Sequence, residues 1–554
     1  MSTQAIPAVT SSGQPILILK EGAAQTRGKD AQRNNIMAAK LIAEIVRTSL
    51  GPRGMDKMLV DSLGDVTITS DGATVLKEID IQHPSAKMMV EIAKTTDNEV
   101  GDGTTSAVVL AGALLERAEE LIDKDVHPTV IVDGYRKAAE QALKVLEKIA
   151  VKIPPDQKDW LLKIAKTSME TKMVSRESGI LAEIAASALL QVAEKSDEVY
   201  KVDIDDVKVE KKAGASLAET KLIKGLVIDK EVVHAGMPKR IKNAKIALIN
   251  APLEIEKTEF DAKININNPE QIKLFLDEEN RMLKTMVDRI AEVGANLLIC
   301  QKGIDDIAQH YLAKAGIIAV RRAKQSDMDK LAKATGGRVV TNLEDLSASD
   351  LGFAELVEER KIEEDKWVFI EGCKNPKAVT ILVRGGTQRI VDEAERSIHD
   401  ALCVTRDVMQ KPAIVAGGGA PEAHMAHELR EWSHTLSGRE QLAAQKFAEA
   451  LEVIPLTLAE NAGLDTIDTQ VELRAKHGQG MVWAGVGVFD GGVVDTYEKG
   501  VFEPLAVKEQ IIKSATEAAC MIIRIDDVIA AGKVRETGAR PGRPGEEMPG
   551  AGED

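Results

Sequence analysis

One carboxylate stands between two glycines directly before a long apolar run, and this arrangement constrains the chain more than any other feature. Residues 100–112 read Val-Gly-Asp-Gly-Thr-Thr-Ser-Ala-Val-Val-Leu-Ala-Gly. The apolar residues that follow predict a helix from Thr104 to about Ile122. The first N–H groups of a helix have no backbone partners, and glycines allow the preceding backbone to close around an anion. The stretch therefore predicts a tight loop at the N-terminus of a helix.

Asp102 gives this loop a chemical interpretation. A carboxylate would repel a bare phosphate, but it fits a site in which a divalent cation such as Mg²⁺ lies between the two. A helix dipole contributes only about 0.3–1 kcal/mol, so a triphosphate also needs the metal and several charge-assisted hydrogen bonds of about 1.5–3 kcal/mol each. The loop thus predicts a magnesium–nucleotide site. From these residues alone, a capped helix after a glycine turn is the alternative.

Composition limits the class of protein. The chain has 554 residues, enough for more than one domain, and 44% are hydrophobic while only 3% are aromatic, which predicts aliphatic cores. The formal net charge of −16 argues against a nucleic-acid partner. The sequence has no apolar run of about 18 residues and no secretory signal, and its four cysteines are widely spaced. We expect a cytoplasmic, multidomain protein with buried thiols, without a membrane span, disulfide framework or zinc site.

The pattern along the chain predicts an α/β unit inserted into a helical one. Helical patterns dominate residues 30–150 and return from about residue 391. Between them, short apolar runs at 245–249, 295–299, 317–320, 338–341 and 378–383 predict strands. Residues 1–15 and the Gly/Pro-rich residues after 534 are expected to be mobile or disordered.

Three further features are ambiguous when taken alone. The Ser70-Asp71-Gly72 stretch predicts a hairpin turn between strands at 66–69 and 74–76. Asp400 lies in a helical pattern and is expected to be an exposed helix carboxylate. Three glycines at 417–419 precede a helix that starts near Pro421, and they allow the backbone to approach a ligand closely.

A projecting arm is one interpretation of the centre of the chain. Asn268-Pro269 predicts the start of a helix whose apolar residues include Phe275, Leu276 and Leu283. Glu279 interrupts this apolar stripe, and residues 254–267 before the helix lack a clear period. An ordinary packed helix is the alternative. The arm interpretation requires that the outer apolar residues contact another molecule.

These stretches, in this order, closely resemble the chaperonins, specifically the group II chaperonins of archaea (the thermosomes). The resemblance extends from about residue 15 to residue 531, and its most specific parts are residues 50–59, 64–74, 101–111, 437–442 and 459–465. Bacterial chaperonins lack the insertion interpreted here as an arm, so the chain is more similar to the archaeal type.

The resemblance implies a multidomain chaperonin fold. A mainly α-helical equatorial ATPase domain would comprise 1–150 and 410–533, and an α+β intermediate domain would comprise 151–219 and 376–409. An α/β apical domain would comprise 220–375, with a helical protrusion at about 253–284 as a built-in lid, and 534–554 would form a disordered tail. The implied activity is ATP-dependent protein folding. Its implied partners are unfolded proteins and identical or paralogous subunits in two stacked rings of eight or nine.

The resemblance also implies roles for individual residues. ATP and Mg²⁺ are the implied cofactors, with K⁺ left open as a further cation. Asp102 would hold Mg²⁺, while Asp71 and Asp400 would activate the attacking water. Because these residues lie far apart in sequence, we further expect that Asp400 arrives only when the intermediate domain moves down. The implied nucleotide-binding residues are Leu50, Gly51, Pro52, Gly72, Gly103, Thr104, Thr105, Ser106, Lys172, Gly418, Gly485 and Glu503. Glu503 would bind the ribose hydroxyls, and Lys172 would sense the γ-phosphate.

Two alternative functions would use the same magnesium–nucleotide loop around Asp102. One is a metabolic kinase or phosphatase that depends on a magnesium–nucleotide complex. The other is a ring or filament scaffold with residual ATPase activity. A small-molecule enzyme should form a small oligomer, whereas a chaperonin should form a particle near a megadalton and suppress aggregation of unrelated proteins.

Overall fold

The computed structural model describes residues 7–9, 15–17, 24–172, 174–196, 199–255, 269–374 and 376–530. The predicted tail, residues 256–268 of the predicted arm and most of the predicted mobile segment 1–15 lie outside the described residues. Within that N-terminal segment, β1 (Pro7–Val9) pairs antiparallel with β2 (Pro15–Leu17). Among the described residues, no helix is long and apolar enough to cross a membrane.

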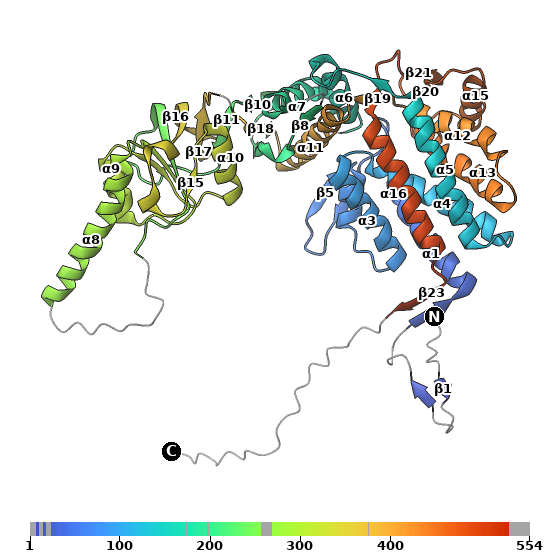
Figure 1. Cartoon of the computed structure of the whole chain (residues 1–554), viewed down its shortest axis with the longest axis horizontal. Coiled ribbons are helices and arrows are strands. Elements are labelled where there is room, and N and C mark those ends of the chain that lie inside the picture. Colours follow the sequence, from blue (N-terminus) through green and yellow to red (C-terminus); the bar gives the residue numbers. More distant parts are fainter. Residues whose placement is uncertain are drawn as a thin grey trace, which may run out of the picture.

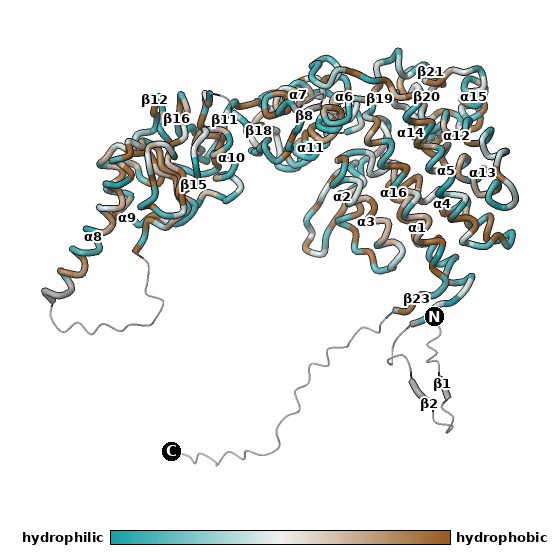
Figure 2. Tube along the Cα trace, viewed as in Figure 1, coloured by the Kyte–Doolittle hydropathy of each residue, from teal (hydrophilic) through white to brown (hydrophobic). Residues whose placement is uncertain are grey.

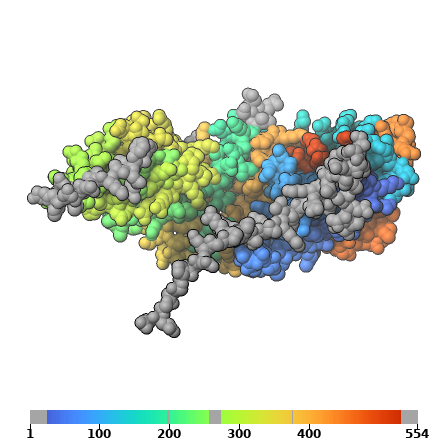
Figure 3. All heavy atoms as spheres, turned by 90° about the horizontal axis from the view of Figure 1, so that it is seen from below, coloured from blue at the N-terminus to red at the C-terminus, as the bar shows by residue number. Residues whose placement is uncertain are grey.

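Three parts follow one another along the longest axis of the molecule (Figure 1). We call them the helical, middle and sheet parts. The chain starts in the helical part, passes through the middle part to the sheet part, and returns by the same route (Figure 1). The space-filling view from below shows the same order, with the sheet part at one end and the helical part at the other (Figure 3).

The helical part combines segments from both ends of the described chain. Its helices are α1 (Gly28–Arg47), α2 (Gly72–Glu78), α3 (Pro84–Val100), α4 (Thr104–Asp123), α5 (Pro128–Ile149), α12 (Ala420–Ser433), α13 (Arg439–Leu451), α14 (Val453–Asn461), α15 (Thr466–Gly478) and α16 (Leu505–Ile523). Its strand pairings are β3 (Ala24–Arg27) with β23 (Asp527–Ala530), β4 (Lys57–Val60) with β5 (Val66–Thr69), β20 (Ala484–Val486) with β21 (Val493–Asp495), and β6 (Val151–Lys152) and β22 (Phe502–Pro504) on either side of β19 (Ala413–Ala416).

Helix α4 is the centre of this part, and it begins at Thr104 as the sequence predicts. It packs against α1, α3, α13 and α16. Val108, Leu110 and Leu114 are fully buried. A helix that is apolar on all sides is stable only when other elements surround it. The apolar run after the glycine loop therefore fixes the loop against the interior of the protein.

The middle part joins the other two through a short sheet and three helices. Its helices are α6 (Lys158–Glu170), α7 (Ser178–Val192) and α11 (Gln388–Gln410). Its sheet has the order β10–β18–β9, formed by β9 (Val207–Ala213), β10 (Lys221–Ile223) and β18 (Val379–Gly385), and a separate hairpin pairs β7 (Glu194–Ser196) with β8 (Val199–Lys201). The apolar core of this part is continuous with that of the helical part.

The sheet part is an α/β layer with its own core. Its seven strands are β11 (Gly225–Ile228), β12 (Arg240–Ile249), β13 (Leu297–Cys300), β14 (Ile318–Val320), β15 (Val339–Val340), β16 (Gly352–Ile362) and β17 (Asp365–Glu371), and its helices are α8 (Pro269–Glu292), α9 (Asp306–Lys314) and α10 (Gln325–Thr335). Strand β12 pairs in parallel with β13 and β15, and antiparallel with β16. Because parallel strands require long crossovers, the helices lie between successive parallel strands. Figure 2 shows the strands as an apolar layer next to more polar helices.

The hairpin predicted around Asp71 is wrong. Strand β5 pairs with β4, which precedes it, and residues 74–76 belong to helix α2. Asp71 is the N-cap of α2, and its side chain accepts a hydrogen bond from the Thr74 N–H at 2.8 Å. Asp-Gly suits a hairpin turn and a helix start equally well, so the local pattern does not separate them.

The buried-thiol prediction is confirmed, since Cys300, Cys373, Cys403 and Cys520 are all buried free cysteines.

Candidate functional site

A cavity of about 420 Å³ lies where the helical and middle parts meet. Most of the residues that the sequence points to line it: Leu50, Gly51, Pro52, Asp71, Asp102, Gly103, Thr104, Thr105, Ser106, Lys172, Asp400, Gly418 and Glu503. They come from segments up to several hundred residues apart. The fold thus brings one glycine loop, the four predicted acidic side chains and the predicted lysine to a single cavity.

Two of the predicted residues, Gly72 and Gly485, support the wall from behind instead of lining the cavity. A Cβ atom on Gly72 would lie 2.5 Å from the Thr105 Oγ1 atom. A Cβ atom on Gly485 would lie 3.0 Å from the Gly418 carbonyl oxygen. Both positions therefore require glycine for close packing of the wall, and neither offers a side chain to a ligand.

Asp102 is held by the loop and by the middle part at once. Its Oδ1 atom accepts a hydrogen bond from the Gly103 N–H at 2.6 Å, and its Oδ2 atom accepts one from the Ser168 hydroxyl at 2.7 Å. Gly103 is the N-cap of α4 and has a φ of 76°, which a side-chain-bearing residue rarely adopts. This geometry turns the N-terminus of α4 towards the cavity, next to the carboxylate.

Asp71 reaches the same place from the start of α2. Its Oδ2 atom accepts hydrogen bonds from the Thr74 N–H and the Thr74 hydroxyl, at 2.8 and 2.7 Å. Its Oδ1 atom accepts a longer hydrogen bond from the Thr104 hydroxyl, at 3.4 Å. The helix cap therefore fixes one carboxylate oxygen and leaves the other on the side of α4.

Asp400 is buried, so the expectation of an exposed helix carboxylate is wrong. Its side chain is 10% exposed and forms an ion pair with that of Lys172, which is 7% exposed. Asp400 comes from α11 and Lys172 follows α6, so both belong to the middle part. A buried pair of opposite charges keeps both side chains in place, because separating them would leave a charge without compensation.

The cavity is electrostatically negative beyond the groups that line it. Asp97, on α3 behind the loop, has its pKa raised to about 6. Burial is the main cause, and the charges of Asp71 and Asp102 add to it while that of Lys172 opposes it. The lining itself has more carboxylates (Asp71, Asp102, Glu170, Asp400, Asp490 and Glu503) than lysines (Lys172, Lys499 and Lys508), and this excess of negative charge favours a cationic ligand or a cation-bound anion.

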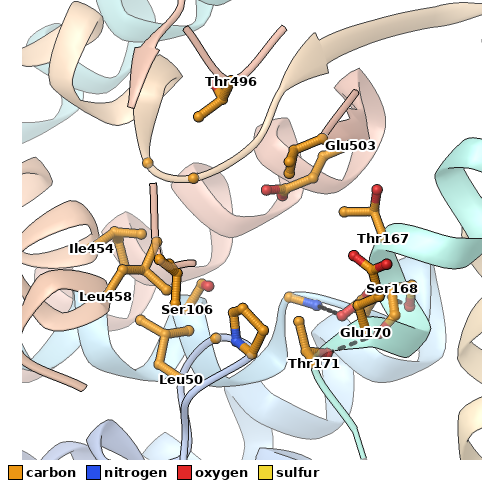
Figure 4. A pocket seen from close by; sticks show the side chains of 18 of the residues that line it. Leu50, Ser106, Thr167, Ser168, Glu170, Thr171, Ile454, Leu458, Thr496 and Glu503 are labelled. Carbon is orange, nitrogen blue, oxygen red and sulfur yellow. Dashed lines mark hydrogen bonds between the residues drawn. The ribbon is translucent and has the colours of Figure 1, made fainter. Parts of the chain in front are cut away.

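One side of the cavity is apolar. Leu50, Ile454 and Leu458 gather there in Figure 4, opposite Thr167, Ser168 and Thr171 of the middle part. The carboxylate of Glu503 points into the space between the two sides (Figure 4). A flat apolar group and a polar, charged group of one ligand could therefore be bound at opposite sides.

Several of these residues were not predicted as site residues. Ser168 is the clearest case, because its hydroxyl bonds directly to Asp102 although the two lie 66 positions apart. Ile454 and Leu458 lie on α14 and carry no motif of their own. Only the fold, or a resemblance that covers these segments, could identify them.

Comparisons with known proteins match almost the whole chain to chaperonins. The model of the TCP-1/cpn60 chaperonin family matches residues 42–533. The chain is 59% identical over 539 residues to a thermosome subunit alpha from Archaeoglobus fulgidus, covering 97% of this chain and 99% of the relative. It is 60% identical over 523 residues to a thermosome subunit from Methanopyrus kandleri, covering 94% and 96%. It is 58% identical over 543 residues to a thermosome subunit from Pyrococcus abyssi, covering 98% of each.

Proposed function

This chain belongs to the TCP-1/cpn60 chaperonin family, and on that premise we propose that it is an ATP-dependent chaperone acting as one subunit of a double ring. The observation that carries the proposal is the single cavity that collects Asp71, Asp102 and Asp400 around the N-terminus of α4. The resemblance to group II chaperonins stated from the sequence is confirmed by thermosome subunits of matching length.

The three parts of the molecule take the three domain roles of such a chaperone. The helical part would be the equatorial domain that binds ATP, and the middle part would be the intermediate domain that hinges. The sheet part would be the apical domain that binds clients. The proposed boundaries are those predicted from the sequence, except that β6 at 151–152 pairs with β19 in the helical part and β10 at 221–223 pairs with β18 in the middle sheet.

The residues around Asp102 fit a magnesium ion that is bound together with a nucleotide. Within the described residues, no group of three or more His, Cys, Asp or Glu side chains is arranged to hold a metal ion. Mg²⁺ in nucleotide sites uses one or two carboxylates, phosphate oxygens and water, so a single carboxylate beside hydroxyl groups is the appropriate set. Mg²⁺ held by Asp102 would neutralise charge on the phosphates during their transfer.

The phosphates would be bound by the start of α4. Thr104, Thr105 and Ser106 line the cavity, and their hydroxyls and the N–H groups of this first turn would donate hydrogen bonds to the phosphate oxygens. Lys172 adds a positive charge from the middle part. Because its ammonium pairs with Asp400, a γ-phosphate nearby would compete for it and so report its presence to that part.

Asp71 and Asp400 would hold and activate the attacking water. The free side of the Asp71 carboxylate faces α4, and Asp400 lines the same cavity. A carboxylate accepts a proton from water as a general base when it lies within hydrogen-bonding reach. Since Asp400 and Lys172 both belong to the middle part, movement of that part would bring them to the nucleotide together, which couples hydrolysis to closure.

The apolar side of the cavity would hold the base. Leu50, Ile454 and Leu458 offer aliphatic contacts, and Val486 adds a backbone segment next to Gly418. The carboxylate of Glu503 would then lie near the ribose, which separates the base from the phosphates.

Clients would be captured by exposed apolar side chains of the sheet part. On α8, Leu274, Phe275 and Leu276 are exposed, whereas Leu283 in the same helix is buried. The half of α8 that carries these exposed side chains projects away from the sheet part in Figure 1, whereas Leu283, Val287 and Ile290 of its other half belong to the core of that part. This favours the projecting arm over an ordinary packed helix. Exposed apolar surface binds unfolded chains without sequence specificity.

Electron microscopy of the purified protein, combined with a refolding assay, tests the proposal. We expect a double ring that hydrolyses ATP and raises the yield of an unrelated unfolded protein only when ATP and Mg²⁺ are present. A small oligomer that consumes ATP with a defined acceptor would instead indicate a metabolic enzyme. A ring that does not promote refolding would indicate a scaffold.

A further inference from the structure

A buried lysine in the wall of the cavity connects two acidic residues. The Lys508 Nζ atom, on α16, lies 2.8 Å from the Glu422 Oε1 atom and 2.7 Å from the Glu503 Oε2 atom. The side chains of Lys508 and Glu422 are 4% and 3% exposed, whereas that of Glu503 is 27% exposed. Glu503 is therefore the most exposed of the three, and both it and Lys508 line the cavity, whereas Glu422 does not.

The backbone fixes where the second oxygen of Glu503 lies. Strand β22 pairs with β19 so that Glu503 is opposite Val415, two residues before Gly417. A Cβ atom on Gly417 would be 2.7 Å from the Glu503 Oε1 atom. Thus Oε2 is bound to Lys508, and Oε1 occupies the space that the missing side chain of Gly417 leaves at the wall.

The charges favour a rigid arrangement. Burial lowers the pKa of Lys508, but the attraction of Glu422 and Glu503 outweighs this and raises it above the usual range for lysine. Lys508 consequently stays charged at neutral pH. An ammonium that is buried between two carboxylates cannot leave either one without exposing an uncompensated charge in the interior. Glu503 is held in one orientation before any ligand arrives.

We propose that Lys508 is a positioning residue for ribose recognition: it holds Glu503 so that Oε1 accepts hydrogen bonds from the ribose hydroxyls of the bound nucleotide. This inference rests on the proposed nucleotide site. Lys508 acts on the ribose through Glu503, and Glu422, which does not line the cavity, supplies the second charge that keeps the ammonium in place. The arrangement makes the cavity selective for ribonucleotides over their deoxy analogues.

The test compares the affinities for ATP and for 2′,3′-dideoxy-ATP, measured by calorimetry on assembled protein. In the unmodified protein, the loss of both hydroxyls should weaken binding by about 10- to 100-fold, as expected for hydrogen bonds to a charged group. Glu503→Gln should reduce this discrimination ratio to near one. Lys508→Met combined with Glu422→Gln should reduce it to the same extent, although neither change touches the ribose.

The double change is preferred because Lys508→Met alone leaves two buried carboxylates unpaired and can prevent folding. Glu422→Gln alone is the matched control, since Lys508 still holds Glu503 and the ratio should stay high. Lys508→Arg should also keep most of the discrimination. Adding Glu503→Gln to the double change should lower the ratio no further, because the residues act through one another.

The outcomes distinguish an error in the ribose contact of Glu503 from an error in the positioning role of Lys508. If Glu503→Gln leaves the discrimination ratio unchanged, the proposed ribose contact is wrong. If Glu503→Gln abolishes discrimination but Lys508→Met with Glu422→Gln preserves it, the ribose contact stands and the positioning role of Lys508 is overturned.

Discussion

Replacing Gly103 with alanine should damage the nucleotide site through a backbone effect whose size follows from the structure. Gly103 has a φ of +76°, and an added Cβ atom would lie 2.7 Å from the Ile511 Cδ1 atom and 3.0 Å from the Val507 Cγ1 atom. A residue with a side chain costs about 1–2 kcal/mol in this conformation. Overpacking against two buried side chains adds about 1–3 kcal/mol. Moving the start of α4 away from Ile511 and Val507 would relieve this strain.

That movement should be measurable as lost ATP affinity. Displacing the first turn of α4 would break at least one charge-assisted hydrogen bond to phosphate, worth about 1.5–3 kcal/mol, so the Kd for ATP should rise by about 10- to 150-fold. Calorimetry on protein whose assembly has been checked by size-exclusion chromatography measures this directly. The thermal midpoint should fall as well.

Gly336→Ala is the matched control. Gly336 has a similar φ of +72°, but a Cβ atom there would meet no atom within 4 Å. It caps the C-terminus of α10 in the sheet part, away from the cavity. This variant should lose only the backbone contribution to stability and should bind ATP normally. The reasoning is refuted if Gly103→Ala binds ATP as tightly as the unmodified protein, or if Gly336→Ala loses affinity equally.

Further predictions concern stability and client capture. Burial lowers the pKa of His477 to about 4, so as the pH falls below 6.5 the unfolded chain takes up the proton first and up to about 3 kcal/mol of stability is lost by pH 4. His477→Gln should flatten the fall of the thermal midpoint across this range, and an unchanged pH dependence would contradict the assignment. Lys208→Met should lower the free energy of unfolding by about 3–5 kcal/mol, because the Asp327 carboxylate, which is 2.7 Å from the Lys208 ammonium, loses its counter-charge. Asp327 is only 2% exposed, so water does not replace the lysine. Adding Asp327→Asn to the same chain should recover most of the lost stability, as measured by denaturant unfolding. No recovery would mean that the ion pair is not the cause. Changing Leu274 and Leu276 to serine should alter stability by less than about 0.5 kcal/mol but weaken suppression of client aggregation in a light-scattering assay; unchanged suppression would exclude this surface from client binding.

Local patterns predicted the elements whose sequence signals are strong and unambiguous. The start of α4 at Thr104, the start of α8 at Pro269 and the parallel strands around β13 follow from helix caps and short apolar runs. The structure contradicts the hairpin at Asp71, because an Asp-Gly pair also caps a helix when a residue three positions later donates its N–H. Such a choice is decided by tertiary pairing, here of β5 with the preceding strand.

The site was predicted from the sequence only in part, for a related reason. Asp102 is recognisable from its own loop, but Asp400 taken alone has the pattern of an exposed helix residue and is in fact buried against Lys172. Ser168 has no local signal that connects it to Asp102. Contacts between distant segments carry these roles, and the resemblance to a family supplied what residue patterns did not.

The most direct test of the account measures ATP binding and ATP cleavage separately in Asp400→Ala. Asp392→Ala is the matched control, because Asp392 is another α11 carboxylate that pairs with a lysine, Lys211 at 2.8 Å. If Asp400 activates the attacking water, Asp400→Ala should bind ATP with nearly normal affinity while phosphate release under saturating ATP slows by about 10²- to 10⁴-fold, and Asp392→Ala should cleave ATP normally. Phosphate release by Asp400→Ala at the rate of the unmodified protein would contradict the central claim.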